Sequence, residues 1–281
     1  MQERQHGQLG FVQSVLPWFV AGGAVLIYLL TLNHWVSLNS LPYVAKVTGW
    51  DWSLPLQAPL FFFFSYPIRW LPSGWQPIAL NAFAVVCAAL TLALLARSVA
   101  LLPHDRTLAQ RQRERNEFSL LSIPAAWLPP LFAALACGLQ LTFWENATAA
   151  TNEALDLLLF AYVIRCLLEF RVSQRDSWLF RLALVYGLGV TNNWAMIGFF
   201  PCFLIALIWI KGASLFQPAF LVRMLALGLA GLLMYLLLPI LWATSEVNSV
   251  DFAQAFRAEL ANQKGFLFDT PQLRNRAFVL S

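Results

Sequence analysis

The chain has 281 residues, of which 59% are hydrophobic and only 11% are charged, and its formal net charge is +4. Soluble domains carry roughly 25% charged residues, so this composition excludes an ordinary soluble protein and indicates an integral membrane protein. The sequence has no basic patch interleaved with aromatic residues, which argues against nucleic acid as a partner. The four cysteines lie in apolar runs without CxxC spacing, so we expect buried thiols rather than disulfides or a local metal motif.

Seven apolar runs have about the length that crosses a ~30 Å hydrocarbon core. The sequence therefore predicts an all-α membrane protein, a polytopic transmembrane bundle of about seven helices. The predicted spans are 11–32, 78–102, 120–143, 152–170, 178–190, a sixth that follows Trp194 and ends near 210, and 221–242. A Phe-rich run over 58–70 is shorter and is predicted to be interfacial or re-entrant.

The distribution of Lys and Arg over the short loops predicts the orientation. With seven spans, the N-terminus and the Arg-rich loops 103–117 and 171–176 fall on one side, which is predicted to be cytoplasmic. The loops 33–57, 144–151 and 191–194 fall on the outer side of a cell (inner) membrane, and Lys46 is their only basic residue. We expect a transmembrane domain over 1–243 and an outer-face polar tail over 244–281, of the kind that begins a soluble region.

Three carboxylates lie beside or inside the fourth predicted span, namely Glu145, Glu153 and Asp156. An ionised side chain in hydrocarbon costs roughly 2.5–3.5 kcal/mol, so such residues usually face a wet cavity or a partner. Glu153 and Asp156 are three residues apart and share one helix face. The alternative for Glu153 is a place at a helix N-terminus near the water boundary, where the helix dipole favours an acid.

Several motifs of this chain resemble a known family. Phe143-Trp144 is followed by Glu153, and the run Gly187-Leu-Gly-Val-Thr-Asn192-Asn193-Trp194 precedes Met196 and Pro201. These motifs resemble the protein O-mannosyltransferase-like family of GT-C-class membrane glycosyltransferases, whose bacterial branch is largely uncharacterised. The resemblance covers about residues 11–201 and implies a GT-C-like helix bundle with a partly helical first outer loop. Family members are usually longer and add a soluble outer domain, so the chain resembles a fragment of such a protein.

The resemblance also implies a reaction, the transfer of a sugar from a polyprenyl-phosphate donor to a protein or glycan acceptor at the outer face. The acid that the family carries in its first outer loop falls on Asn39, and an amide cannot act as a general base. Asp51 lies in the same loop and is predicted to be the base that takes the proton of the acceptor. Glu153 or Asp156 is predicted to be a second acid that orients the acceptor.

Further residues are predicted to bind substrate and membrane lipid. They are Asn39, Trp144, Glu145, Asp156, Asn192, Asn193, Trp194 and Arg69. Arg69 would neutralise the lipid phosphate, with interfacial snorkelling as the alternative. Asn192, Asn193 and Trp194 would bind and stack on the sugar, or else form the turn between two spans. The residues establish no cofactor and leave a divalent metal open. Two other classes stay open, a non-catalytic scaffold, which the amide at Asn39 favours, and a lipid or solute transporter, for which no internal repeat is found.

Overall fold

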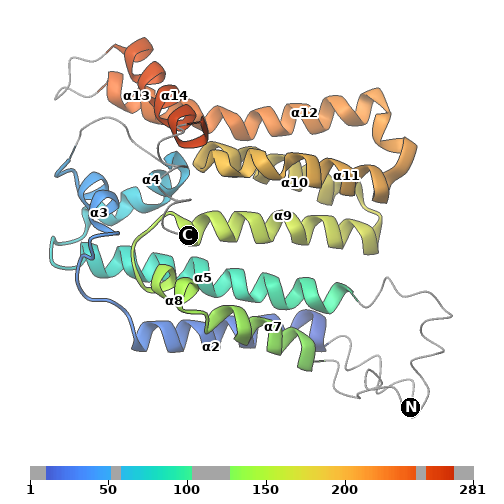
Figure 1. Cartoon of the computed structure of the whole chain (residues 1–281), viewed down its shortest axis with the longest axis horizontal. Helices are drawn as coiled ribbons and strands as arrows, with labels where there is room; N and C mark the ends of the chain where they lie inside the picture. The colour runs from blue at the N-terminus through green and yellow to red at the C-terminus, as the bar shows by residue number, and fades with distance from the viewer. Residues whose placement is uncertain (1–10, 52–57, 103–126, 245–250, 269–281) are drawn as a thin grey trace, which may run out of the picture. The chain divides into compact units, whose positions relative to one another are not determined.

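The computed structural model describes residues 11–51, 58–102, 127–244 and 251–268 (Figure 1). The described residues contain twelve α-helices and several short 3-10 segments, and no strand. The predicted all-α class is therefore confirmed. The chain divides into two compact units. Unit 1 comprises Met1–Val44 and Pro67–Leu182, and unit 2 comprises Ala45–Tyr66 and Ala183–Ser281.

Unit 1 is built around one long helix, α5 (Gln76–Leu101). The helices that pack against it are α2 (Leu16–Leu30), α7 (Leu128–Gly138), α8 (Leu141–Thr148) and α9 (Glu153–Ser173). In Figure 1, α2, α5 and α9 run side by side along most of their length. The buried positions of α5 include the alanines Ala84, Ala88 and Ala96. Small side chains let neighbouring helix backbones approach closely, which explains how one helix contacts four others.

A buried tyrosine links the first helix of unit 1 to α7. The hydroxyl of Tyr28 donates a hydrogen bond of 2.7 Å to the carbonyl oxygen of Gly138, which ends α7. Tyr28 also packs with Leu92 and Phe143 in the core of the unit. The hydrogen bond satisfies a carbonyl that the end of a helix would otherwise leave unpaired.

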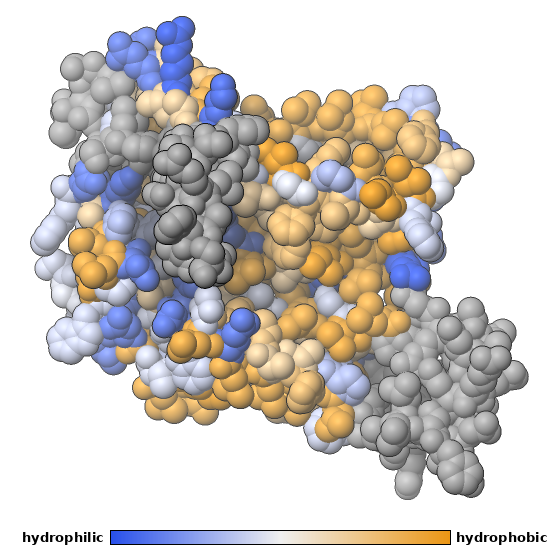
Figure 2. Space-filling view, in the orientation of Figure 1, coloured by the Kyte–Doolittle hydropathy of each residue, from blue (hydrophilic) through white to orange (hydrophobic). Residues whose placement is uncertain are grey.

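Unit 2 contains the last third of the chain together with a short Phe-rich helix. Its elements are α4 (Pro59–Ser65), η3 (Trp194–Phe199), α11 (Phe200–Lys211), η4 (Gly212–Phe216), α12 (Pro218–Leu232), η5 (Leu233–Leu236), α13 (Leu237–Ala243) and α14 (Phe252–Phe268). Helices α3 (Leu41–Thr48) and α10 (Asp176–Asn192) contribute residues to both units, and η1 (Tyr66–Trp70) follows α4. The surface over α12 is hydrophobic (Figure 2), with Val222 and Leu225 about two-thirds exposed, as expected for a lipid-facing helix.

A close approach of two helices holds unit 2 together. A Cβ added to Gly231 of α12 would lie 2.5 Å from the carbonyl oxygen of Leu184 and 2.8 Å from the amide nitrogen of Leu188 on α10. A Cβ on Gly187 would overlap the carbonyl of Gly228 in the same way. Glycine is therefore required at this crossing, and the glycine motif read in the sequence forms a packing interface.

The number of spans differs from the prediction. Among the described residues, three segments are long and apolar enough to cross a membrane, Gln76–Leu101, Trp194–Phe216 and Pro218–Ala243. The prediction of about seven is therefore wrong for the part of the chain that the structure describes. Helices α2 and α7 have 15 and 11 residues, so they extend only about 22 and 16 Å, short of the ~30 Å core.

The charged residues of the predicted fourth span explain why it is not among the candidate membrane spans. Helix α9 has 21 residues and is long enough, but it contains Glu153, Asp156, Arg165, Glu169 and Arg171. The predicted fifth span corresponds to α10, which has 17 residues. Residues 120–126 of the predicted third span, and Arg106, Arg111, Arg113 and Arg115 of the basic loop, lie outside the described residues.

Two further predictions concern the Phe-rich run and the polar tail. Helix α4 has only seven residues, too few to cross a bilayer, and an interfacial or re-entrant position of the Phe-rich run stays a prediction. The segment that was expected to be a polar tail contains α14, a helix of 17 residues that packs against α13. The buried positions Ala255 and Glu259 are four residues apart and so lie on one face of α14.

Candidate functional site

Two acidic residues of unit 1, Glu153 and Asp156, lie in the first turn of α9. The hydroxyl of Tyr43 donates a hydrogen bond of 2.6 Å to Oδ1 of Asn152, and Nδ2 of Asn152 donates one of 3.0 Å to Oδ2 of Asp156. Burial raises the pKa of Tyr43, and the negative charges of Glu153 and Asp156 raise it further. The phenol therefore stays protonated and remains a donor at neutral pH. This chain of hydrogen bonds holds the Asp156 carboxylate in a fixed orientation.

Glu153 lies beside this chain, and its side chain is exposed. It occupies the first turn of α9, where the partial positive charge of the helix dipole stabilises an acid. The structure thus places Glu153 where the alternative interpretation put it. Exposure also leaves its carboxylate accessible to a substrate, so its predicted role in binding an acceptor stays a prediction.

The other predicted site residues of unit 1 surround the α8–α9 region or lie in the first loop. Trp144 of α8 is half-buried, and its ring meets the Tyr28 ring edge-on with centroids 5.3 Å apart. Glu145 and Asn39 are exposed. The carbonyl of Arg69 accepts a hydrogen bond of 3.1 Å from Nε2 of Gln76.

Asn81 is a buried residue that ties two loops of unit 1 together. Its Oδ1 accepts a hydrogen bond of 2.8 Å from the Ala150 amide, and its Nδ2 donates one of 2.5 Å to the carbonyl of Asn33. Asn81 thereby connects the α8–α9 loop to the segment after α2. Its partners are 48 and 69 residues away along the chain, so its role emerges only from the tertiary structure.

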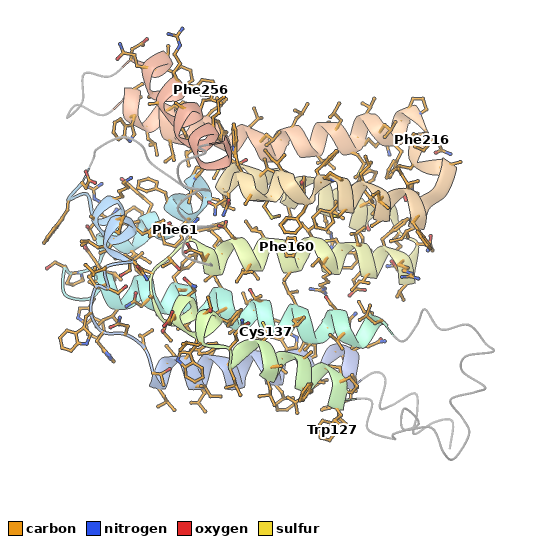
Figure 3. The ribbon with its side chains drawn as sticks, in the orientation of Figure 1. Phe61, Trp127, Cys137, Phe160, Phe216 and Phe256 are labelled. Carbon is orange, nitrogen blue, oxygen red and sulfur yellow. The ribbon has the colours of Figure 1, made fainter. Side chains whose placement is uncertain are left out.

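In unit 2, the amide side chains that were predicted to bind sugar support helix N-termini. Oδ1 of Asn192 accepts hydrogen bonds of 3.1 and 3.0 Å from the amides of Leu60 and Phe61, the latter labelled in Figure 3. The N-cap of α4 is Ala58, which has a φ of 57° and no side chain that can cap. Oδ1 of Asn193 accepts a hydrogen bond of 3.0 Å from Ala195 and caps η3. Contacts of either residue with sugar stay a prediction.

Asp51 lies directly after α3, and its side chain is half-buried. Its amide donates a hydrogen bond of 3.1 Å to the carbonyl of Ala45. Burial lowers the pKa of Lys46, and the nearby charge of Asp51 acts in the opposite direction. Asp51 belongs to unit 2, whereas Glu153 belongs to unit 1, so the two predicted catalytic carboxylates are contributed by different units. Residues 52–57, which follow Asp51, lie outside the described residues.

Sequence reasoning missed a buried carboxyl group in unit 2. Glu259 of α14 is 3% exposed, and burial raises its pKa to about 8. Neither Glu259 Oε1 nor the hydroxyl of Tyr235 has a hydrogen-bond partner among the described residues. Phe256, labelled on α14 in Figure 3, packs edge-on against Tyr235 with ring centroids 5.9 Å apart. The i, i+4 spacing of Glu259 from Ala255 would place it on the packing face, but only if the segment were known to be helical.

An apolar groove lies in unit 1. It has a volume of about 180 Å³ and is lined mainly by side chains of α2 and α7, including Phe19, Ile27 and Leu135. Tyr28 and Trp144 also line it, so the groove extends to α8. Its composition suits a hydrocarbon chain. Among the described residues, no group of three His, Cys, Asp or Glu side chains could hold a metal ion.

These features define a class, an all-helical protein with candidate membrane spans and with carboxylates grouped at the end of one helix. The family of the chain follows from its sequence. The family model for the N-terminal domain of protein O-mannosyl-transferase TMEM260 matches residues 52–215, which is more than half of the chain, and the chain therefore belongs to this family. The resemblance predicted from the motifs is confirmed. No curated protein and no solved structure matches the chain.

Proposed function

We propose that the protein is a membrane glycosyltransferase, or the membrane portion of one, that transfers a sugar from a polyprenyl-phosphate donor to a protein or glycan acceptor at the outer face. Membership of a family named for O-mannosyl transfer supports sugar transfer as the reaction. The observation that carries the proposal within the structure is the hydrogen-bonded chain Tyr43–Asn152–Asp156 beside the exposed Glu153. Oriented and accessible carboxylates are what acceptor binding requires.

The proposed mechanism needs a base, a group that orients the acceptor, and a place for the donor lipid. Asp51 is the proposed base, because it is the carboxylate of the first loop and an amide occupies position 39. Glu153 and Asp156 are proposed to bind acceptor hydroxyl groups as hydrogen-bond acceptors. The groove between α2 and α7 is proposed to hold the polyprenyl chain, with Trp144 at the end where the groove meets α8.

Sugar transfer by membranes that contain each variant tests this proposal. Asp51→Asn should reduce transfer by at least about 100-fold, because general-base catalysis contributes about 10²–10⁴. Glu153→Gln should raise the KM for the acceptor more than it lowers kcat. Asp251→Asn, an exposed acid of unit 2 outside the proposed site, should leave transfer unchanged. Unchanged transfer by both site variants would remove these carboxylates from the reaction.

A second candidate function is that of a non-catalytic membrane subunit related to this family. Asn39 favours it, because the position that the family resemblance assigns to a catalytic acid carries an amide on an exposed side chain. The substitution Asn39→Asp distinguishes the two functions. If the protein is a catalyst that uses Asp51, Asn39→Asp should change sugar transfer little. If the protein has lost its catalytic base, the wild type should show no transfer, and Asn39→Asp should restore it.

A further inference from the structure

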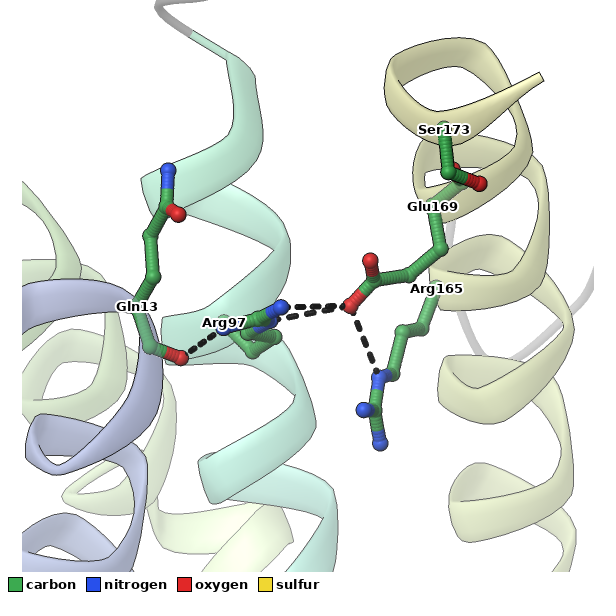
Figure 4. A network of polar contacts seen from close by, with 5 residues as sticks. All are labelled: Gln13, Arg97, Arg165, Glu169 and Ser173. Carbon is green, nitrogen blue, oxygen red and sulfur yellow. Dashed lines mark hydrogen bonds and ion pairs between the residues drawn. The ribbon is translucent and has the colours of Figure 1, made fainter. Parts of the chain in front are cut away.

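A cluster of charged residues in unit 1 lies away from the proposed catalytic residues. Oε1 of Glu169 accepts a hydrogen bond of 2.9 Å from Nε of Arg97 and lies 2.9 Å from Nη2 of the same residue (Figure 4). The same oxygen lies 3.5 Å from Nε of Arg165. Arg97 also donates to the carbonyl of Gln13. One carboxylate oxygen of α9 is therefore shared by guanidinium groups of two helices.

The positive charge of this cluster exceeds its negative charge. Arg165 and Arg181 lie over the same indole ring, with their guanidinium carbons 5.7 and 4.7 Å from the centroid of Trp178. These contacts group Arg97, Arg165 and Arg181 around Glu169 and Trp178, with three positive charges and one negative charge. We call this set the arginine cluster. Like charges held this close repel one another, so the cluster favours an anion from outside the chain.

The surroundings of Arg165 strengthen the case for an external anion. Arg165 precedes the last residue of α9, Ser173, by eight positions, and a rise of 1.5 Å per residue places it about 12 Å from that end. Its partner in an ion pair, Glu169, already accepts a hydrogen bond from Arg97. Nε of Arg165 is buried and has no hydrogen-bond partner in the described part of the chain, since the 3.5 Å separation from Glu169 is too long for a hydrogen bond.

We propose that the arginine cluster binds the phosphate headgroup of an anionic membrane phospholipid. One guanidinium group can bind two phosphate oxygens at once, and Arg165 of α9 and Arg181 of α10 both lie at the Trp178 ring. Trp178 is half-buried, and indole rings favour the headgroup level of a bilayer. Basic pockets between membrane helices on the cytoplasmic side bind acidic headgroups, and this is the side to which the arginine loops are predicted to belong. Lipid binding here does not depend on sugar transfer.

Thermal unfolding of the purified full chain in a neutral detergent tests the proposal. Phosphatidylglycerol should raise the unfolding midpoint, whereas phosphatidylcholine and inorganic phosphate at equal concentration should not. In the variant R165Q/R181Q, the phosphatidylglycerol concentration that gives half of the shift should rise about fivefold for each arginine removed, equivalent to about 1 kcal/mol per contact. Arg223→Gln, which removes an exposed arginine of α12 in unit 2, should keep the wild-type response.

Each other outcome contradicts the proposal. An equal shift with inorganic phosphate would identify a site for free anions, and an unchanged response in the double variant would place lipid binding elsewhere. If the double variant does not fold, Arg181→Gln alone provides the test, because this side chain is exposed and its loss leaves the Arg97–Glu169 pair intact. Bound phosphatidylglycerol counted by native mass spectrometry should then fall relative to wild type, and an unchanged count would overturn the proposal.

Discussion

Oδ1 of Asn192 accepts a hydrogen bond of 3.0 Å from the amide of Phe61, 131 residues earlier in the chain. The same oxygen accepts the amide of Leu60, and Asn192 is 2% exposed. An amide at the end of α10 thus provides the N-cap that the α4 sequence lacks. The Asn of the family motif therefore has a structural role in unit 2, whatever it contributes to substrate binding.

The first prediction concerns this cap. Asn192→Ala leaves two buried amides of α4 without an acceptor, so we expect a loss of about 1–2 kcal/mol in the free energy of unfolding. Chemical or thermal unfolding in detergent measures this loss. Asn193→Ala is the matched control, because Asn193 is less buried and caps only the short η3. Equal destabilisation by the two substitutions would show that the α4 cap has no special importance.

The second prediction concerns the crossing of α10 and α12. Gly231→Ala places a methyl group against backbone atoms of Leu184 and Leu188, which cannot rotate away. We expect a loss of about 1–3 kcal/mol or a sharply reduced yield of folded protein. Gly22→Ala provides the control, because a Cβ there meets no atom within 4 Å. The measurement is the yield of monodisperse protein together with its unfolding midpoint, and two variants that behave alike would contradict the predicted contact.

The third prediction concerns pH. The folded protein holds the proton of Glu259 up to about pH 8, whereas an unfolded chain releases it near 4.5. A folded-state pKa that lies above the unfolded value makes folding most favourable below about pH 4.5, with stability lost as the pH rises towards 8. This change amounts to at most about 4–5 kcal/mol.

Unfolding midpoints recorded from pH 5 to pH 8 measure this effect. We expect the midpoint to fall with rising pH in the wild type and to change much less in Glu259→Gln, which keeps the neutral form at every pH. Glu145→Gln, which alters an exposed acid of α8, should preserve the wild-type slope. A slope that persists in Glu259→Gln would assign the effect to other groups.

The fourth prediction concerns the orientation of the acids at α9. Tyr43→Phe removes the donor to Asn152 and should cost about 1 kcal/mol of stability. If Asp156 takes part in acceptor binding, the same substitution should also raise the KM for the acceptor. Tyr66→Phe, at an exposed tyrosine, should change neither quantity. A loss of stability with an unaltered KM would leave the hydrogen-bonded chain a purely structural role.

Part of the candidate site could be predicted from the sequence, and part could not. Glu153 and Asp156 stood out because carboxylates are rare in apolar segments, and both lie in the first turn of α9 as the spacing suggested. The hydrogen bond from Tyr43 to Asn152, which holds Asp156, could not be predicted, since Tyr43 lies 109 residues before Asn152. The burial of Glu259 could not be predicted from the sequence, because it depends on the packing of α14 against α13.

The sequence by itself determined the helical class, the membrane character and the family of this protein. These properties depend on composition and short motifs, which act locally along the chain. Only the tertiary structure decided which apolar runs form helices of spanning length, which amide caps α4, and where positive charge collects around Glu169. Each of these depends on contacts between residues far apart in sequence, because helix ends and buried charges are stabilised by the groups that surround them in space.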